Sequence, residues 1–337
     1  MFFHLSATFS RNCDNRFDLN MGNATDTSTD KIREIVSDGD ILLVVGPDKT
    51  RLRVKSMLLM AASNPFSTML GPNWKEGHDM RHHHGPFEVS LPDDNATALE
   101  IICSIIHFQN NKIPRTLAAA DVLAVAVAAD KYDCINALNF ASKTWLRECK
   151  GNPEALMLLA TVAYLFRNAQ AFKELTSALV LNHRDSYLGL GGKEVESVLP
   201  WEVLYSLEEQ RGFARLEVAE ILINGVNSGR CDCGCGWTST YTHAYISKLE
   251  EQSLWPANLS NVSISNALRR VEMMPDPVPS ERTTTCNSAR WHRVPDYRTS
   301  RSFSLERLNK SIGLCLECVR GGSNTFKCTQ PSHRSQG

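Results

Sequence analysis

The sequence lacks an apolar run that could cross a membrane, and it lacks an excess of charge of either sign. Its longest apolar segment, Val122 to Ala129, is far shorter than the ~20 residues that a membrane helix needs. The 36 lysines and arginines nearly balance the 37 acidic residues, which gives a net charge of −1. This balance excludes a histone-like or strongly acidic chain, and it offers no overall attraction to nucleic acid.

Signatures of catalysis are also missing. The chain has no G-x-S-x-G nucleophile turn, no glycine-rich phosphate loop and no H-E-x-x-H helix. None of its cysteines stands in a recognisable nucleophile motif, and a catalytic cysteine needs a neighbouring base and an orienting acid. We therefore expect a protein that is not an enzyme and that has no small-molecule substrate.

The first residues have few features of a secretory signal. No basic residue precedes their apolar side chains, and Arg11, Asp14 and Arg16 soon interrupt them. We therefore expect an intracellular protein, nuclear or cytoplasmic, in a compartment where disulfides are disfavoured. The polar stretch from Gly22 to Asp30 cannot bury enough apolar surface to fold. Residues 1–37 are predicted to be disordered, with one helical turn formed by Ile32 and its neighbours.

Residues 38–148 have the pattern of an α+β domain. Apolar and alternating segments on either side of Pro47 predict a strand hairpin, and Pro65 is expected to separate two short helices. In order, the predicted elements are strands at 41–45 and 51–54, helices within 55–70, a polar loop at 71–85, a strand at 87–91, and helices at 96–108, 118–131 and 135–149. Trp74 is assigned to packing and His107 to the core, and the solvated His82 to His84 run is expected to have no role.

Several of these segments match motifs of a known family. They are Asp40 to Val44, the spacing Leu58-x4-Ser63-x2-Phe66-x2-Met69-Leu70, Glu88 to Asp94, Ile101 to His107, and Leu123 to Tyr132. Residues 38–148 therefore resemble a BTB/POZ domain of the type common in fungal proteins. The resemblance implies a domain that binds other proteins, associates with itself, or docks a cullin-type ubiquitin ligase as a substrate adaptor. It also implies that Leu58, Phe66, Leu123 and Tyr132 share one core.

Residues 149–230 are predicted to be helical. Asn152-Pro153-Glu154 has the cap, first-turn proline and acid of a helix start. Apolar residues then recur at helical spacing, as they do along buried stripes. The stripes are Leu156, Leu159, Ala160 and Ala163, then Phe172, Leu175 and Leu179, and finally Leu216, Ala219 and Ile223. This segment is similar in position and content to the helical extensions that follow BTB domains.

Cysteine is concentrated at the other end of the chain. Seven of the eleven cysteines lie in the last 107 residues, which marks residues 231–337 as a separate cysteine-rich region. The spacing Cys315-x2-Cys318, followed by Cys328-x4-His333, offers three sulfurs and an imidazole for tetrahedral zinc.

A second set begins with Cys231, Cys233 and Cys235, which Cys286, His243 or His292 could complete. Alternatively, one of the three cysteines replaces a member of the first set. A structural zinc region is the leading interpretation, and free thiols or disulfides are the alternatives. Zinc would also supply order to residues 256–335, which are predicted to have little apolar core of their own.

The same region is mildly basic. Residues 280–337 hold ten lysines and arginines against four acids, interspersed with Trp291, Tyr297 and Phe303. This pattern suits either solvated surface charge or contact with phosphates, and it contains no helical Cys₂His₂ finger or basic zipper. The leading hypothesis is a non-enzymatic protein-interaction protein for which nucleic acid is not an expected partner. The alternative is a transcriptional or chromatin-associated regulator that uses the basic cysteine-rich tail.

Overall fold

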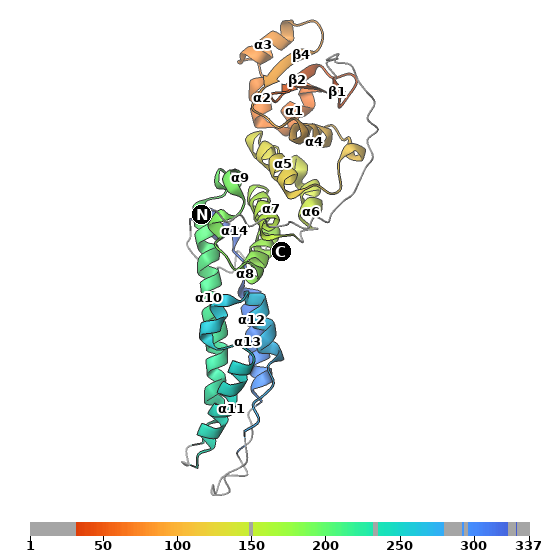
Figure 1. Cartoon of the computed structure of the whole chain (residues 1–337). Coiled ribbons are helices and arrows are strands. Elements are labelled where there is room, and N and C mark those ends of the chain that lie inside the picture. The colour runs from red at the N-terminus through yellow and green to blue at the C-terminus, as the bar shows by residue number, and fades with distance from the viewer. Residues whose placement is uncertain are drawn as a thin grey trace, which may run out of the picture. The chain divides into compact units, whose positions relative to one another are not determined.

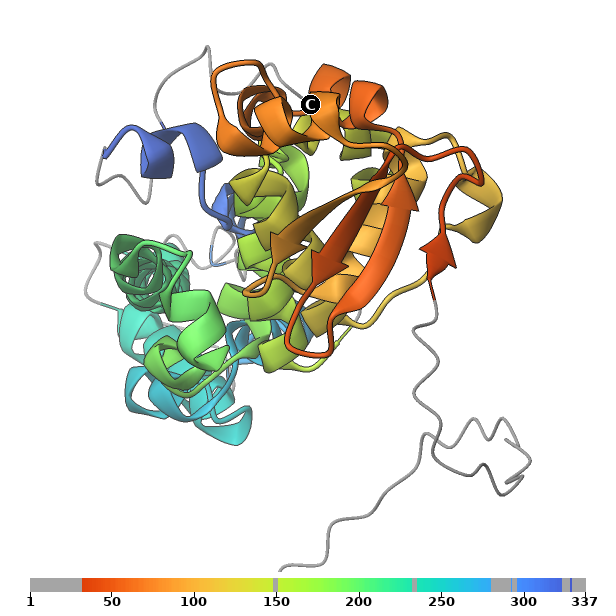
Figure 2. The same ribbon diagram turned by 90° about the horizontal axis from the view of Figure 1, so that it is seen from above.

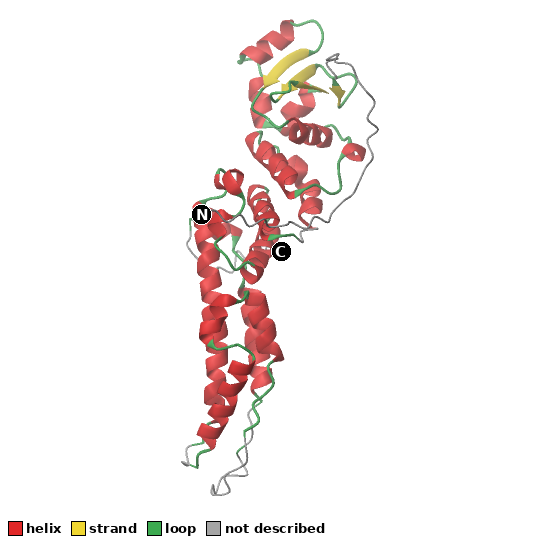
Figure 3. Cartoon of the chain, in the orientation of Figure 1, coloured by secondary structure: helices red, strands yellow, loops and turns green. Residues whose placement is uncertain are grey.

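A small mixed sheet forms the N-terminal part of the computed structural model, which describes residues 32–147, 151–231, 235–279, 292, 296–322 and 328. Its strands are β1 (Arg33–Glu34), β2 (Ile41–Val45), β3 (Thr50–Val54) and β4 (Phe87–Leu91), in the order β1-β3-β2-β4. The β2–β3 pair is an antiparallel hairpin, and β1 and β4 pair in parallel with it. Figure 3 shows these strands among helices, so the described chain is mixed α+β and mostly helical.

Helices follow the hairpin and pack near the sheet (Figure 1). They are α1 (Ser56–Ala62), α2 (Asn64–Met69), α3 (Lys75–His82), α4 (Ala96–Ile106), α5 (Ala119–Lys131) and α6 (Asn139–Arg147), with 3-10 turns η1 (Asn110–Lys112) and η2 (Ile135–Leu138). The break between α1 and α2 lies just before Pro65, as expected, and the Ser63 side chain caps α2 by accepting from the Phe66 N–H. The three predicted strands are confirmed.

Three local predictions in this part are wrong. The expected helical turn at residues 32–36 is instead the short strand β1, because the N–H groups of Ile35 and Val36 donate to the Arg53 carbonyl at the sheet edge. The expected polar loop contains α3. Trp74, assigned to packing, is 55% exposed. A polar composition concealed α3, and a single tryptophan carries no periodicity that could reveal its environment.

Three of the motifs that carry the family resemblance meet in one buried cluster. The rings of Phe66 and Tyr132 stack with centroids 4.5 Å apart, and Ser63 Oγ donates to the Tyr132 carbonyl at 2.5 Å. The Tyr132 hydroxyl and Lys131 Nζ each donate to the buried Asp94 carboxylate at 2.7 Å. This cluster joins the α1–α2 hairpin, the turn before α4 and the end of α5. Of the expected core quartet, Phe66, Leu123 and Tyr132 are buried, and Leu58 is only partly buried.

His107 is buried at the end of α4, as predicted, and it forms hydrogen bonds in its neutral form. Its Nε2 accepts from the Lys55 N–H at 2.9 Å, and its Nδ1 lies 2.7 Å from the Cys103 carbonyl, which requires a proton there. Burial lowers the pKa of His107, because the charged ring would lose its hydration.

This lowered pKa predicts a loss of stability in mild acid. The unfolded chain binds a proton at His107 below about pH 6.5, whereas the folded chain resists it, so stability is full above that pH. It should then fall as the pH decreases toward the folded-state pKa. Replacing His107 with glutamine should flatten this part of the curve. Melting temperatures of both proteins between about pH 7.5 and pH 5.5 test this, and parallel curves would refute it.

The rest of the described chain is helical. Its helices are α7 (Pro153–Leu165), α8 (Ala169–Asn182), α9 (Gly192–Glu196), α10 (Trp201–Val226), α11 (Trp237–Glu251), α12 (Ile264–Met273), α13 (Tyr297–Ser311) and α14 (Leu316–Arg320), with 3-10 turns η3 (Tyr187–Gly189), η4 (Asn227–Gly229) and η5 (Pro256–Asn261). Asn152 caps α7 and Pro153 opens it, as the sequence predicts. None of the helices within the described ranges is long and apolar enough to cross a membrane.

Two of the three predicted stripes in this segment are buried. The residues of α7 and α8 named above lie in the core. The third prediction is wrong, because Leu216 is 70% exposed and Ile223 is 50% exposed. The buried face of α10 is a different one, which includes Val203, Leu207 and Val218. Helical spacing identifies an apolar face but does not show whether anything covers it.

The C-terminal region shares its core with the preceding helices. Helices α12 and α13 pack against α10, and α14 contacts α8. Their buried residues include Val271, Leu305, Leu308 and Ile312. These helices use α8 and α10 as the opposite side of their core, which agrees with the expectation that the region has little core of its own. Figure 2 shows these helices beside the green helices of the preceding segment.

Candidate metal centres

Three donor atoms from two distant parts of the chain meet in the first centre, which we call the Cys231 site. Cys231 Sγ and Cys235 Sγ are 3.7 Å apart. His292 Nε2 lies 3.1 Å from Cys231 Sγ and 3.5 Å from Cys235 Sγ. His292 is buried, and both cysteines are partly buried. All three side chains therefore present a soft or borderline donor to one common point.

The sulfur–sulfur separation and the Cys235–His292 separation agree with the edges of a zinc coordination tetrahedron, and the Cys231–His292 separation is shorter. Zinc–sulfur and zinc–nitrogen bonds at tetrahedral angles place two sulfurs about 3.8 Å apart and a sulfur and a nitrogen about 3.6 Å apart. A disulfide would bring the sulfurs to about 2.05 Å, so Cys231 and Cys235 are not joined by one. Two thiolates and a neutral imidazole would also balance the charge of a divalent cation.

Local structure holds each ligand of the Cys231 site in place. Cys231 follows η4 at the end of α10, and its N–H donates to Thr238 Oγ1 at 2.8 Å. Cys235 precedes Gly236, whose positive φ of 83° turns the chain into α11. The Trp237 ring stacks on His292 with centroids 5.0 Å apart and an interplanar angle of 6°. The site therefore links the α10–α11 turn to the connection between α12 and α13.

The second centre, the Cys315 site, contains Cys315, Cys318 and Cys328, with sulfurs all within 4.8 Å of one another. Cys315 is the N-cap residue of α14, and Cys318 lies one turn later in that helix. A C-x2-C spacing across a helix start directs both sulfurs to the same side. Cys318 is buried, whereas Cys315 and Cys328 are partly buried.

The segment before Cys315 is fixed to the helical core. The N–H of Leu314 donates to Thr176 Oγ1 at 2.9 Å, and the N–H of Gly313 donates to Gln210 Oε1 at 2.9 Å. A Cβ on Gly313 would come within 2.6 Å of the Lys173 carbonyl, and its φ is +113°. Glycine is required there, because no other residue accepts both this conformation and this contact. The Cys315 site is therefore positioned by α8 and α10.

Part of each predicted ligand set lies outside the described residues. This applies to His333 of the first set and to Cys233 and Cys286 of the second. Of the three residues considered to complete the second set, the structure brings His292 to the cysteines. His243 is exposed on α11 and does not join a metal-ligating cluster within the described chain.

Two other cysteines are buried and belong to neither cluster, in contrast to the cysteines of the two sites. Cys103 and Cys134 are buried in the N-terminal part, and burial raises the pKa of both, that of Cys134 to about 12. Each stays protonated at neutral pH and is a poor ligand and nucleophile. They act as small apolar side chains, so among the described cysteines those of the two clusters are the ones that could hold a metal ion.

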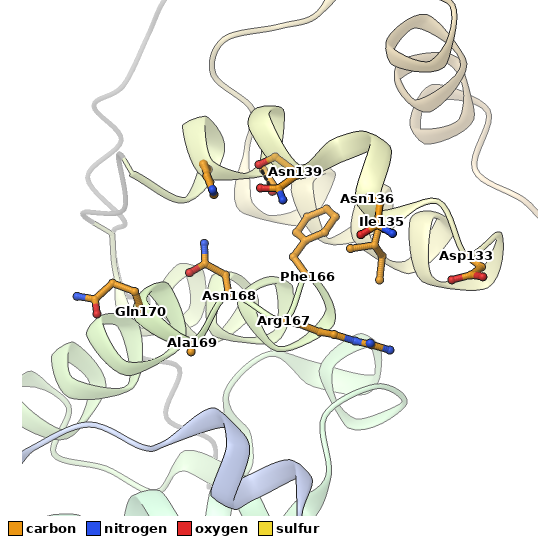
Figure 4. Close-up of a pocket in the computed structure, with 11 residues that line it drawn as sticks. Asp133, Ile135, Asn136, Asn139, Phe166, Arg167, Asn168, Ala169 and Gln170 are labelled. Carbon is orange, nitrogen blue, oxygen red and sulfur yellow. Dashed lines mark hydrogen bonds between the residues drawn. The ribbon is translucent and has the colours of Figure 1, made fainter. Parts of the chain in front are cut away.

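A polar cavity of about 360 Å³ lies between α6 and the turn that joins α7 to α8 (Figure 4). Its wall includes four carboxamides, from Asn136, Asn139, Asn168 and Gln170. Asn168 also caps α8, because its Oδ1 accepts from the Ala171 N–H at 3.0 Å. The lining of this cavity is therefore rich in groups that donate and accept hydrogen bonds.

No protein-family model, curated protein or solved structure matches this chain.

Proposed function

We propose that this chain is a non-enzymatic protein-interaction protein that acts through a BTB/POZ-type domain at residues 38–148. Residues 149–230 serve as its helical extension, and residues 231–337 form a region stabilised by zinc. In the most specific form of the proposal, the protein is a substrate adaptor that presents a client to a cullin-type ubiquitin ligase.

The observation that carries this proposal is the cluster formed by Ser63, Phe66, Asp94 and Tyr132. These residues belong to three separate motifs of the resemblance, and they contact one another through ring stacking and short hydrogen bonds. Motif residues matched by chance would have no reason to pack together. The element order also supports the proposal, since a strand hairpin precedes a helical hairpin and β4 returns to pair with β2.

A groove in this domain offers a surface for a partner. It has a volume of about 570 Å³ and is lined by Asn64, Pro65, Thr68, Met69, Trp74, Glu76 and Asp133. The Trp74 side chain is 55% exposed at this groove. Exposed tryptophans are frequent energetic centres of protein interfaces, because one ring buries a large apolar area at little entropic cost. We assign this groove to partner binding.

Both metal centres are assigned to structural zinc. In the Cys315 site, His333 is the proposed fourth ligand of Cys315, Cys318 and Cys328. The Cys231 site is proposed to hold a second ion through Cys231, Cys235 and His292, with Cys233 as the predicted additional ligand. A bound zinc with four protein ligands supplies cross-linking and leaves no position for a reacting water. The chain's own residues orient the ligands, as Trp237 does for His292.

The chromatin-associated alternative receives less support from the tail. Arg301 is 1% exposed, and one of its N–H groups donates to the Met274 carbonyl. Tyr297, counted among the aromatic residues of the basic region, is also buried. These two side chains are engaged in the helical core, so they do not add to a phosphate-binding surface.

Affinity purification of tagged full-length protein tests the function. If the protein is an adaptor, a cullin co-purifies with the wild type, and its recovery falls at least tenfold with Trp74→Ala. The matched control is Phe140→Ala, which removes a ring that is 87% exposed outside the groove. Recovery of no cullin contradicts the adaptor. Recovery of chromatin that declines steeply with salt favours the regulator instead.

A further inference from the structure

An apolar stripe along α10 is left exposed by the described part of the chain. Its large members are Trp201, Tyr205, Leu216 and Ile223, which are 67%, 46%, 70% and 50% exposed. At 3.6 residues per turn, all four fall within a sector of about 60° on one side of the helix. Figure 1 shows α10 as a long helix with α12 and α13 beside it. Those neighbours contact its other side, where Val203, Leu207 and Val218 are buried.

The exposed area of this stripe is comparable to the largest apolar patch of a typical monomer. The four side chains together expose roughly 400–500 Å², and the largest patch on a monomer, about 300–600 Å², is often functional. Trp201 and Tyr205 form a ring pair, with centroids 6.3 Å apart. Such an arrangement places two aromatic anchors at one end and two aliphatic residues at the other.

Gly212 lies in the middle of the same stripe and has no explanation within the chain. It is an exposed position in a 26-residue helix, and a Cβ built there meets nothing within 4 Å. A glycine inside a helix costs about 1 kcal/mol relative to alanine. Its φ does not require glycine either, because it is not among the positive-φ positions. The missing side chain of Gly212 leaves space for a second chain to approach the helix closely at this point.

The charges beside the stripe identify the kind of partner. Glu202, Glu209 and Glu220 follow one side of it, at positions that flank the apolar seam. The two arginines of α10 do not offset them. Arg211 is buried and bonded to Glu208 and the Asp185 carbonyl, and Arg215 donates to the Ser260 carbonyl. The exposed side of α10 is therefore apolar in the middle and acidic at its flank.

We propose that this stripe binds an amphipathic helix of another protein whose apolar seam is flanked by lysines and arginines. The helix would extend over about 33 Å, the distance from Trp201 to Ile223. Its bulkiest side chain would lie over Gly212, and its basic residues would pair with Glu202, Glu209 and Glu220. The proposal does not depend on the BTB-type function of residues 38–148.

Two other candidate partners of the α10 stripe fit its acidic flank less well. A second copy of this chain would bring the same acidic flank, and in an antiparallel pair the two acidic flanks would face each other. A membrane surface would repel the same glutamates, because the lipids that attract peripheral helices are anionic. Both remain measurable outcomes of the experiment below.

A designed peptide pair tests the proposal on the full-length protein. Each peptide has 22 residues with leucine at the seam positions, and the flanks carry lysine in one peptide and glutamate in the other. Fluorescence anisotropy at low salt should show micromolar binding of the lysine peptide and at least tenfold weaker binding of the glutamate peptide. The variants Leu216→Asn and Glu209→Lys should each weaken binding of the lysine peptide at least fivefold.

The variant Gly212→Ala distinguishes a role of Gly212 in partner binding from a role in the stability of α10. Since the added methyl meets nothing in the chain, the variant should melt at a higher temperature, yet it should bind the lysine peptide several-fold more weakly. Phe303→Ala, at a site that is 69% exposed on α13, is the control and should bind normally.

Equal binding of both peptides, or unchanged binding by Leu216→Asn, would overturn the proposal. Sedimentation equilibrium that finds a dimer broken by Leu216→Asn would assign the stripe to a second copy. Vesicles of anionic lipid that bind the wild type but not this variant would assign it to a membrane.

Discussion

Replacing Cys318 with serine is expected to release one of about two zinc ions per chain and to make the C-terminal end sensitive to protease. Serine keeps the size of the side chain, but its hydroxyl stays protonated and does not replace a thiolate as a zinc ligand. Cys318 is buried in α14, and its sulfur lies within 4.8 Å of those of Cys315 and Cys328. Zinc binding by flexible chains contributes folding free energy on the order of 10 kcal/mol, which would be lost at this site.

Contacts before the Cys315 site limit how much of the chain should unfold when this zinc is lost. Leu308 and Ile312 pack in the core before the Cys315 site begins, and Leu314 donates to Thr176. We therefore expect new cleavage after Leu314, with residues 38–148 still folded. Cys235→Ser should remove the other ion and expose the α10–α11 turn instead. The double variant should hold no zinc.

Elemental analysis of protein prepared with zinc and without chelators measures these outcomes, and limited proteolysis locates the exposed segment. Cys103→Ala is the matched control, because it removes a buried thiol that does not belong to either cluster and should leave the zinc content unchanged. Fewer than ~0.2 zinc ions per wild-type chain would refute both sites. One ion per chain in Cys318→Ser and also in the wild type would refute the Cys315 site alone.

The N-terminal part of the fold was largely predictable because its signals are local. The apolar run in β2, the alternation in β3 and β4, and the proline near the start of α2 are signals that act over a few residues, and the structure confirms the elements they predict. Helix α3 has no such signal, since it is polar and contains Gly77. A Cβ on that glycine would lie 1.9 Å from the Gly71 carbonyl, so the requirement for glycine arises from a tertiary contact.

The candidate sites show the same division between local and distant information. The Cys315-x2-Cys318 spacing predicts a chelating turn by itself, and the structure places both residues at the start of α14. The choice of His292 could not be made from the sequence, because it lies 57 positions after Cys235. Likewise, the spacing of Leu216 and Ile223 indicated an apolar face, but only the packing of α10 shows that the described part of the chain leaves this face exposed.

Phe66→Ala is expected to destabilise the N-terminal part of the fold by about 3–5 kcal/mol. Phe66 is 1% exposed, and its ring stacks on Tyr132 with an interplanar angle of 8°. Truncation removes the buried ring, leaves a cavity, and removes an aromatic contact worth about 0.5–1.5 kcal/mol beyond the area it buries. Single domains have only about 5–15 kcal/mol of stability, so this loss is a large fraction of the total.

A second variant separates the ring contact from the polar network around it. Tyr132→Phe keeps the stacked pair but removes the hydroxyl that donates to Asp94 at 2.7 Å. The Asp94 carboxylate would retain Lys131, so the expected cost is smaller, about 1–3 kcal/mol. Phe140→Ala is the control, because a ring that is 87% exposed contributes less than about 0.5 kcal/mol.

Thermal unfolding, measured by circular dichroism, ranks the three variants by their loss of stability. At about 4 °C or more per kcal/mol for a domain of this size, Phe66→Ala should lower the melting temperature by at least about 10 °C. Tyr132→Phe should lower it by a few degrees, and Phe140→Ala should leave it unchanged. A Phe66→Ala protein that melts at the wild-type temperature would contradict the shared core of Phe66 and Tyr132. Because that cluster carries the proposed BTB-type domain, the same result would also remove its main support.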